Sequence, residues 1–200
     1  MGNSSSSTSS SSGVKNETQL VMWGPWSSGK TTILYKQLKG YDTVTTISTT
    51  GFNTESVTYK GREFVIYDLG GREKLRPPWR NYFRRAEAII YVVDSTDIPR
   101  IEEDVTAELA SLLEFTGAGT KSGPAGRDEN EEGRKAPVLV FANKQDLDGA
   151  RSAGEIREVL RKVEGLQGRK WDVIPCCAVD GNGVGEGMEW LVETLQSQGK

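Results

Sequence analysis

Four short, nearly unbroken apolar runs along the chain predict buried β-strands. They occupy residues 18–23, 88–93, 137–142 and 171–175. Residues 52–59 and 63–69 instead alternate between apolar and polar side chains around a turn at residues 60–62, which predicts a two-stranded hairpin.

Between these strands, apolar residues recur at helical spacing. The predicted helices cover residues 32–38 and 77–85, a long segment marked by Ile101, Val105, Leu109 and Leu112, a segment marked by Ile156, Val159, Leu160 and Val163, and residues 188–195. Strands that alternate with helices are typical of an α/β fold.

Two polar segments lack any such pattern. Residues 1–13 are nearly all serine, and we expect residues 1–16 to form a disordered segment before a single domain at residues 17–200. Residues 117–135 are dominated by glycine and charged side chains, which predicts a disordered surface insertion. A partner-binding loop is the alternative, but a tolerated insertion is favoured because loops absorb added length at little cost.

The segment between the first predicted strand and the first helix fits the phosphate-binding pattern G-x-x-x-x-G-K-[ST]. It reads Gly24-Pro25-Trp26-Ser27-Ser28-Gly29-Lys30-Thr31. The backbone N–H groups of such a loop surround an anion, and the helix that follows adds its dipole. We expect Lys30 to reach the outer phosphates and the Thr31 hydroxyl to bind Mg²⁺, with nucleotide contacts that extend to Thr32.

Two later segments complete a candidate nucleotide site. Asp68 closes the second hairpin strand before two glycines, where it could hold Mg²⁺ through water, although this pattern alone is equally a strand-ending turn. Asn143, Lys144 and Asp146 follow another strand. The Asp146 carboxylate can accept hydrogen bonds from guanine N1–H and its amine, while the Lys144 stem lies across the base.

A loop after the last predicted strand is expected to touch the same base. It runs from Cys176 to Val179, with Cys177, Ala178 and Val179 as the expected contacts, and the Ala178 N–H is placed to meet guanine O6. The adjacent cysteines, Cys176 and Cys177, are interpreted as small buried apolar residues. They are poorly placed to bridge each other, which predicts a reduced, intracellular chain.

Composition narrows the function further. The chain has 200 residues and no histidine, which excludes Ser-His-Asp catalysis and histidine-ligated zinc. Its net charge of −3 gives no electrostatic case for nucleic acid. No apolar run is long enough for a membrane span, and no secretory signal is recognisable.

The first six residues fit the N-myristoylation pattern M-G-x-x-x-[ST], with Gly2 as the acceptor. A plain flexible tail is the equally weighted alternative. A single acyl chain binds membranes only marginally, and Lys15 is the only basic residue nearby. We therefore expect any membrane attachment to be weak and reversible.

Together these segments resemble small GTPases of the ADP-ribosylation factor (Arf) and Arf-like family, from about residue 19 to 198 with the insertion excepted. The matching stretches are GPWSSGKTT, TTGFNTESV, YDLGGREKLRPPWRNYF, IIYVVDSTD and VLVFANKQDL. The resemblance implies a three-layer P-loop GTPase fold: a mostly parallel six-stranded sheet with one antiparallel edge strand and helices on both faces. It also implies GTP or GDP with Mg²⁺ as cofactors.

The resemblance assigns further roles by position. Thr49 corresponds to the first-switch threonine that binds Mg²⁺, with Thr50 as the alternate, and the Gly71 N–H would touch the γ-phosphate. Phe52, Tyr67 and Tyr82 match the aromatic cluster that family effectors recognise. The hairpin at residues 52–69 slides in register in family members and releases the N-terminal segment toward the membrane.

The resemblance also implies a cellular setting. It suggests a monomer that meets an exchange factor, a GTPase-activating protein and effectors. We expect a cytoplasmic protein with reversible association with Golgi or other endomembranes, in vesicle or organelle traffic.

Three departures from the family pattern bear on catalysis. Arg72 stands where the family has a water-orienting glutamine, Trp26 replaces a small or acidic residue of the phosphate loop, and serines replace the N-terminal amphipathic helix. An arginine has no acceptor with which to orient water. Slow intrinsic hydrolysis is therefore expected, although Arg72 as an internal arginine finger is the alternative reading of the catalytic pair Gly71 and Arg72.

Three functions follow from these observations. The first is a GTP-hydrolysing switch with an impaired intrinsic rate, and the second is a GTP-binding interaction module that has lost hydrolysis. A phosphate-loop kinase is the third, but Asn143 and Asp146 argue against it because they are suited to guanine.

Overall fold

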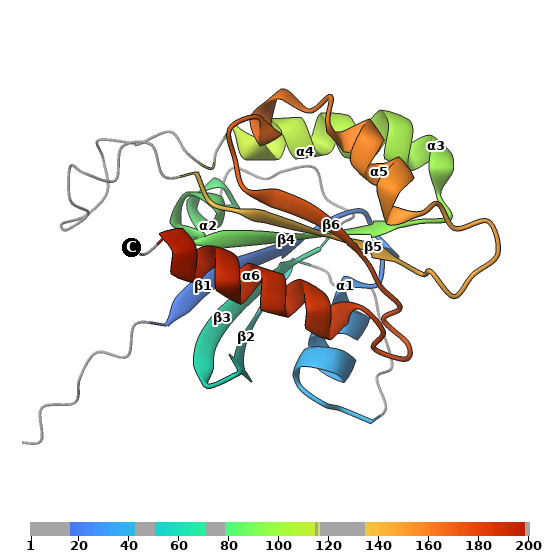
Figure 1. Ribbon diagram of the computed structural model, residues 1–200. Helices are drawn as coiled ribbons and strands as arrows, with labels where there is room; N and C mark the ends of the chain where they lie inside the picture. The colour runs from blue at the N-terminus through green and yellow to red at the C-terminus, as the bar shows by residue number, and fades with distance from the viewer. Residues whose placement is uncertain (1–16, 43–50, 71–78, 115, 117–134, 199–200) are drawn as a thin grey trace, which may run out of the picture.

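Six strands form one sheet in the computed structural model, which describes residues 17–42, 51–70, 79–114, 116 and 135–198 (Figure 1). The strands are β1 (Thr18–Trp23), β2 (Phe52–Tyr59), β3 (Arg62–Leu69), β4 (Ala88–Asp94), β5 (Val138–Asn143) and β6 (Trp171–Pro175). Their order across the sheet is β2-β3-β1-β4-β5-β6. Neighbouring strands are parallel except for the edge pair β2 and β3, in which Phe52 lies opposite Leu69. The predicted sheet is confirmed.

Helical segments connect the strands and cover both faces of the sheet. They are α1 (Lys30–Thr32), η1 (Ile33–Leu38), α2 (Arg80–Arg85), α3 (Ile98–Arg100), η3 (Ile101–Val105), α4 (Thr106–Leu113), α5 (Ala153–Leu160), η5 (Glu164–Leu166) and α6 (Val184–Gln198). In Figure 1, α4 and α5 lie on one face of the sheet, and α1 and α6 lie on the other. None of the helices in the described part of the chain is both long and apolar enough to cross a membrane.

Several helices differ in extent or winding from the prediction. Helix α6 begins at Val184, four residues earlier than the apolar pattern indicated, because three glycines at 183, 185 and 187 obscure its start. Helix α5 ends at Leu160, and Val163 reaches the core from an extended backbone after it. The first helix widens into a π-helical turn in η1, where Lys39 N donates to Leu34 O at 3.0 Å.

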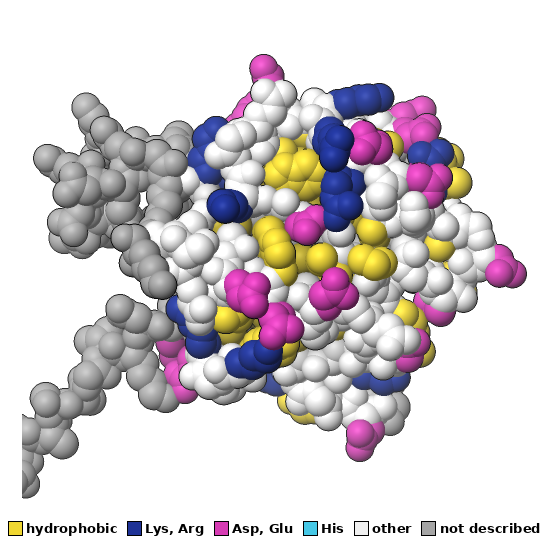
Figure 2. Space-filling view, in the orientation of Figure 1, with side chains coloured by type: hydrophobic (Ala, Val, Ile, Leu, Met, Phe, Trp, Pro, Cys, Tyr) yellow, Lys and Arg dark blue, Asp and Glu magenta, His cyan; other side chains and the backbone are white. Residues whose placement is uncertain are grey.

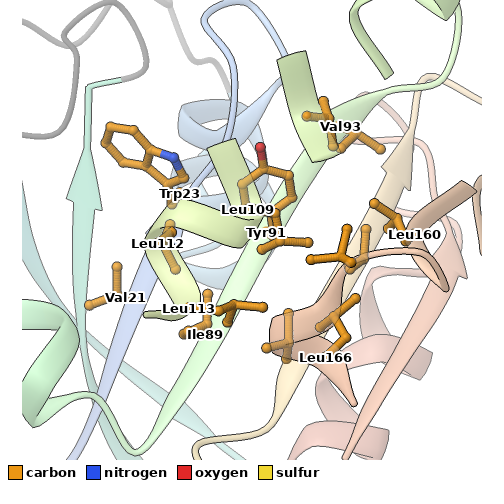
Figure 3. Packing of buried hydrophobic residues seen from close by; sticks show 14 of the residues in the cluster. Val21, Trp23, Ile89, Tyr91, Val93, Leu109, Leu112, Leu113, Leu160 and Leu166 are labelled. Atoms are coloured by element: carbon orange, nitrogen blue, oxygen red, sulfur yellow. The ribbon is translucent and has the colours of Figure 1, made fainter. Parts of the chain in front are cut away.

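Alternate residues of the strands other than the edge strand β2 enter two separate cores. In β1, Val21 and Trp23 face α2, α4 and α5, whereas Leu20 and Met22 face η1 and α6. Figure 3 shows the first core, in which Trp23 and Tyr91 pack among leucines of the covering helices. Because strands such as β4 and β5 are buried on both faces, their sequences are continuous apolar runs.

The surface around these layers is mixed in charge. On the face drawn in Figure 2, lysine and arginine side chains are interspersed with aspartate and glutamate, and small apolar areas lie between them. Two polar contacts join the hairpin to α6. Lys60 forms an ion pair with Glu189, and the Tyr59 hydroxyl donates to Gly185 O at 2.9 Å.

Candidate functional site

The carboxyl ends of the parallel strands bring the predicted site segments to one edge of the sheet. The phosphate loop (residues 24–31) follows β1, and Asp68 lies in β3. The base motif (residues 143–146) begins at the end of β5, and the base loop (residues 176–179) follows β6. Ligands of open α/β sheets bind at this edge. Segments that are far apart in the sequence thus meet where a nucleotide would bind.

Two glycines of the phosphate loop are required by close backbone approaches. Gly24 has φ +140°, and a Cβ there would lie 2.1 Å from the carbonyl oxygen of Val92. Gly29 has φ +98°, and a Cβ there would lie 2.1 Å from Asn143 Nδ2. The loop therefore fits tightly between β4 and the base motif, which a larger residue at either position would prevent.

Lys30 lies inside the phosphate loop and is only 5% exposed. Its Nζ donates to the carbonyl oxygens of Gly24 and Pro25, both at 2.8 Å. Burial lowers the pKa of Lys30 to about 8, against the opposing effect of the negative charges of Asp68 and Glu108. The ammonium group is thus held inside the loop, where a bound phosphate would restore its preference for the charged form.

Thr31 and Asp68, two of the predicted Mg²⁺ ligands, lie side by side. Thr31 Oγ1 donates to Asp68 Oδ2 at 3.4 Å, although the residues are 37 positions apart. Among the described residues, no group of three or more cysteine or acidic side chains is placed to hold a metal ion. Mg²⁺ commonly takes one or two protein oxygens together with phosphate oxygens and water, so this pair of hard oxygen ligands fits it.

Asn143 connects the phosphate loop to the base loop. Its side chain is 1% exposed; Nδ2 donates to Ser28 O at 2.7 Å, and Oδ1 accepts from Ala178 N at 2.8 Å. The Ala178 N–H, which we expected to meet guanine O6, is therefore already engaged and would be shared with Asn143 in a nucleotide complex. Asn143 acts here as a brace between the two loops.

The rest of the base motif is oriented by residues that sequence reasoning missed. Lys144, at φ 69°, pairs with Asp94 at 2.5 Å. Burial alone would raise the pKa of Asp94, but hydrogen bonds from Lys144 and Thr96 outweigh it and lower this pKa. The Gln145 amide donates to Ser95 Oγ at 2.9 Å, and the Asp146 side chain is exposed at the rim. An acidic residue that ends a buried strand was the available signal for Asp94.

The base loop itself is largely buried. Cys176 and Cys177 are buried free thiols, as interpreted from the sequence, and burial raises the pKa of each. Ala178 is also buried, whereas the Val179 side chain projects into solvent. Thr32, at the other end of the predicted contacts, lies in α1 and is half-buried.

The Trp26 side chain points outward from the phosphate loop. It is 46% exposed, and the Arg100 guanidinium lies 5.5 Å from the centre of its ring. Arg100 is held in turn by Asp97 at 3.2 Å. Cation–π contacts of this kind orient an aromatic side chain. The indole is therefore fixed beside the loop. Like Asp94, Arg100 is a site residue that the sequence alone did not indicate.

The three aromatic residues predicted to contact effectors are packed together. Tyr82 lies 5.4 Å from Phe52 and 4.8 Å from Tyr67, measured between ring centres. Phe52 is about half exposed, so the group presents an aromatic ring to solvent. The remaining predicted residues, Gly2, Thr49, its alternate Thr50, Gly71 and Arg72, lie outside the described part of the chain, as do the N-terminal segment 1–16 and residues 117–134 of the insertion.

Comparisons with known proteins agree with this geometry. The ADP-ribosylation factor family matches residues 4–195 of the chain. Among solved structures, the chain is similar to the Arl6 (BBS3) small GTPase of Trypanosoma brucei, which was solved with the bound nucleotide analogue GppNp. The two chains are 33% identical, the match covers 92% of this chain and 99% of that one, and the TM-score is 0.75.

Proposed function

The chain belongs to the ADP-ribosylation factor family, and from this premise we propose that it is a GTP/GDP switch of Arf-like type in vesicle or organelle membrane traffic. Family membership accounts for guanine-nucleotide binding and for interactions with regulators and effectors in general. The cellular process, the rate of hydrolysis and the individual roles of the site residues belong to the proposal.

The proposal rests on one observation: the phosphate loop is in contact both with Asp68, a proposed Mg²⁺ ligand, and with the base motif. Thr31 touches Asp68, and Asn143 bridges Ser28 and Ala178. A site built for phosphate alone would not need the second connection. The combination suits a nucleotide held at both its phosphate and its base ends, with guanine selected through Asp146.

In the proposed complex, backbone N–H groups of the phosphate loop and Lys30 bind the β- and γ-phosphates. Thr31, Thr49 and Asp68 provide the protein side of the Mg²⁺ site, directly or through water. Mg²⁺ supplies charge neutralisation of the phosphates when bound. Gly71 contributes an N–H toward the γ-phosphate, and Lys144, Cys177, Ala178 and Val179 line the base.

We place regulators at the aromatic group of Phe52, Tyr67 and Tyr82, where an exposed ring borders the antiparallel edge of the sheet. An exchange factor, a GTPase-activating protein and effectors are the expected partners. A myristoyl group on Gly2 would give weak, reversible attachment of a monomer to Golgi or other endomembranes.

Intrinsic hydrolysis is proposed to be slow because two positions beside the γ-phosphate depart from the family. Arg72 lacks an acceptor for the attacking water. The outward indole of Trp26, held against Arg100, adds bulk beside the loop. The alternative, a GTP-binding module that cycles by exchange alone, differs only in whether any hydrolysis remains.

Single-turnover hydrolysis of bound GTP tests the proposal. The Arg72→Gln variant is expected to hydrolyse GTP about tenfold or more faster than the natural chain, because glutamine can orient water. Both proteins must first load GTP, and failure of the natural chain to load it would refute the proposed function itself. A natural chain as fast as Arg72→Gln would overturn slow hydrolysis and support the arginine-finger reading.

A further inference from the structure

Both sides of Ala178 in the base loop are held by amide side chains from distant parts of the chain. Its N–H donates to Asn143 Oδ1 at 2.8 Å, and its carbonyl oxygen accepts from Gln37 Nε2 at 2.8 Å. Ala178 is 4% exposed, so its carbonyl oxygen has little access to water and depends on Gln37 for a hydrogen bond. A buried carbonyl that loses its donor costs free energy that solvent does not restore.

Gln37 reaches this loop from the helix that begins at the phosphate loop. It lies in the π-helical segment η1, where the bond from Lys39 N to Leu34 O spans five residues. The wider turn changes the direction of the side chains that follow it. Gln37 thereby connects the phosphate-loop helix to a residue 141 positions away.

The same amide also packs against the far end of the turn that follows the base loop. A Cβ at Gly181 would lie 2.5 Å from Gln37 Oε1, and Gly181 has φ +91°. Glycine at this position therefore lets the Gln37 amide lie flat against the turn. Gln37 contacts both Ala178 and Gly181, and so fixes where the base loop sits relative to η1.

We propose that Gln37 is a positioning residue for base recognition, which aligns the base loop with guanine O6 and couples it to the phosphate-loop helix. This inference rests on the proposed nucleotide-binding function and adds a specific determinant of guanine selectivity to it. Asn143 braces the loop from the base-motif side, and Gln37 braces it from the phosphate side.

The position predicts which contact depends on Gln37. The base loop faces O6, whereas the amine and N1–H of guanine belong to Asp146 in the base motif. Loss of the Gln37 bond should weaken selection at O6 and leave selection of the amine unchanged. A purely structural role would change both selections together or neither.

The test uses the full-length chain and three substitutions. Gln37→Met keeps side-chain length and helix propensity but removes the donor. Gln37→Lys restores a donor, and Gln196→Met makes the same change at an exposed position of α6 as a control. Matching far-ultraviolet circular dichroism spectra and cooperative unfolding of Gln37→Met and Gln196→Met establish that the fold is kept, although the lost hydrogen bond should lower the thermal midpoint of Gln37→Met.

Affinities are measured by competition against fluorescent ribose-labelled GDP, with three nucleotides as probes. 6-Thioguanosine diphosphate replaces O6 by sulfur, and inosine diphosphate lacks the amine. For Gln37→Met, the preference for GDP over the 6-thio analogue should fall about three- to tenfold, the effect of one neutral hydrogen bond. The preference for GDP over inosine diphosphate should stay the same, and Gln37→Lys should recover part of the lost preference.

Other results would overturn the inference. An unchanged O6 preference in Gln37→Met, equal changes in both preferences, or no O6 preference in the natural chain would each refute a positioning role while the proposed function stands. If the natural chain bound no guanine nucleotide at all, the proposed function would fail and the inference with it.

Discussion

A partly buried carboxyl group whose charge acts on Lys30 of the phosphate loop illustrates how single residues tune this protein. Glu108 lies on α4, and its Oε2 accepts from the Tyr91 hydroxyl at 3.0 Å. Burial raises the pKa of Glu108, and the Tyr91 hydrogen bond and the charge of Lys30 only partly oppose this effect. The group therefore carries its negative charge at neutral pH at a cost in stability.

The direction in which this cost changes with pH gives a prediction for Glu108→Gln. With a raised pKa in the folded state, the native chain binds more protons than the unfolded chain between the two pKa values, so its stability falls as pH rises through this window. Glutamine removes this dependence and can still accept from Tyr91. The free energy of unfolding of Glu108→Gln, minus that of the natural chain, should thus increase from pH 4.5 to pH 7.

Urea unfolding at a series of pH values measures this gain. Glu103→Gln changes an exposed carboxylate in the adjoining segment η3 and serves as the matched control, with a curve parallel to that of the natural chain. A Glu108→Gln curve that also stays parallel would mean that Lys30 and Tyr91 compensate the buried charge fully.

At the scale of elements, one arginine joins the two ends of the long insertion. Arg169, which lies between η5 and β6, donates to Thr116 O at 2.6 Å and to Ala136 O at 2.5 Å. It also donates to Gly165 O at 3.2 Å. Burial lowers the pKa of Arg169 to about 10, still well above neutral pH. The end of α4 and the start of β5 are therefore held together independently of the residues between them.

This arrangement predicts opposite outcomes for two changes. Replacement of residues 118–133 by a short Gly-Ser linker should change the free energy of unfolding by less than about 1 kcal/mol, because loop-closure entropy depends weakly on length. Arg169→Met should cost about 3 kcal/mol, because it removes the donor from the buried Thr116 carbonyl oxygen and from the partly buried carbonyl oxygens of Ala136 and Gly165. Denaturant unfolding compares the two. A linker variant that is as unstable as Arg169→Met would show that the insertion itself supports the fold.

At the scale of the whole molecule, the β2–β3 hairpin spans the distance between the candidate site and α6. One end of the hairpin carries Asp68 next to Thr31. The other end is attached to α6 through Tyr59 and Lys60. The sliding of this hairpin that the family resemblance implies would break both sets of contacts. A change at the phosphates would therefore also alter the contacts between the hairpin and α6.

Ligand binding should stabilise this whole arrangement, because the site residues come from segments across the fold. GDP with Mg²⁺ at about 100 times its Kd should add about 2.7 kcal/mol, which raises Tm by roughly 5–10 °C in a chain of this size. Chelation of Mg²⁺ by EDTA should remove much of the shift, since Thr31 and Asp68 then lack the ion they are proposed to bind. Differential scanning fluorimetry provides the measurement.

ADP at the same concentration is the control for base selection. ADP should give little or no shift in Tm, because adenine lacks the N1–H and the 2-amino group of guanine that Asp146 would bind. A shift with ADP equal to that with GDP would contradict guanine selectivity and revive the kinase reading.

Local patterns in the sequence were sufficient for the strands, the phosphate loop and the base motif. A buried strand is an apolar run, and Gly24, Gly29 and Lys30 hold fixed places in a short motif, so each can be recognised without knowledge of its surroundings. The same holds for the family resemblance, which depends on such segments in order.

Only the tertiary structure decided how these segments are connected. Lys144 pairs with Asp94 across 50 positions, Asn143 with Ser28 across 115, and Gln37 with Ala178 across 141. The outward direction of Trp26 was likewise settled by its contact with Arg100. Side-chain spacing along a chain records which face a residue occupies but not which distant residue it meets there, because that meeting depends on how the sheet and helices are packed.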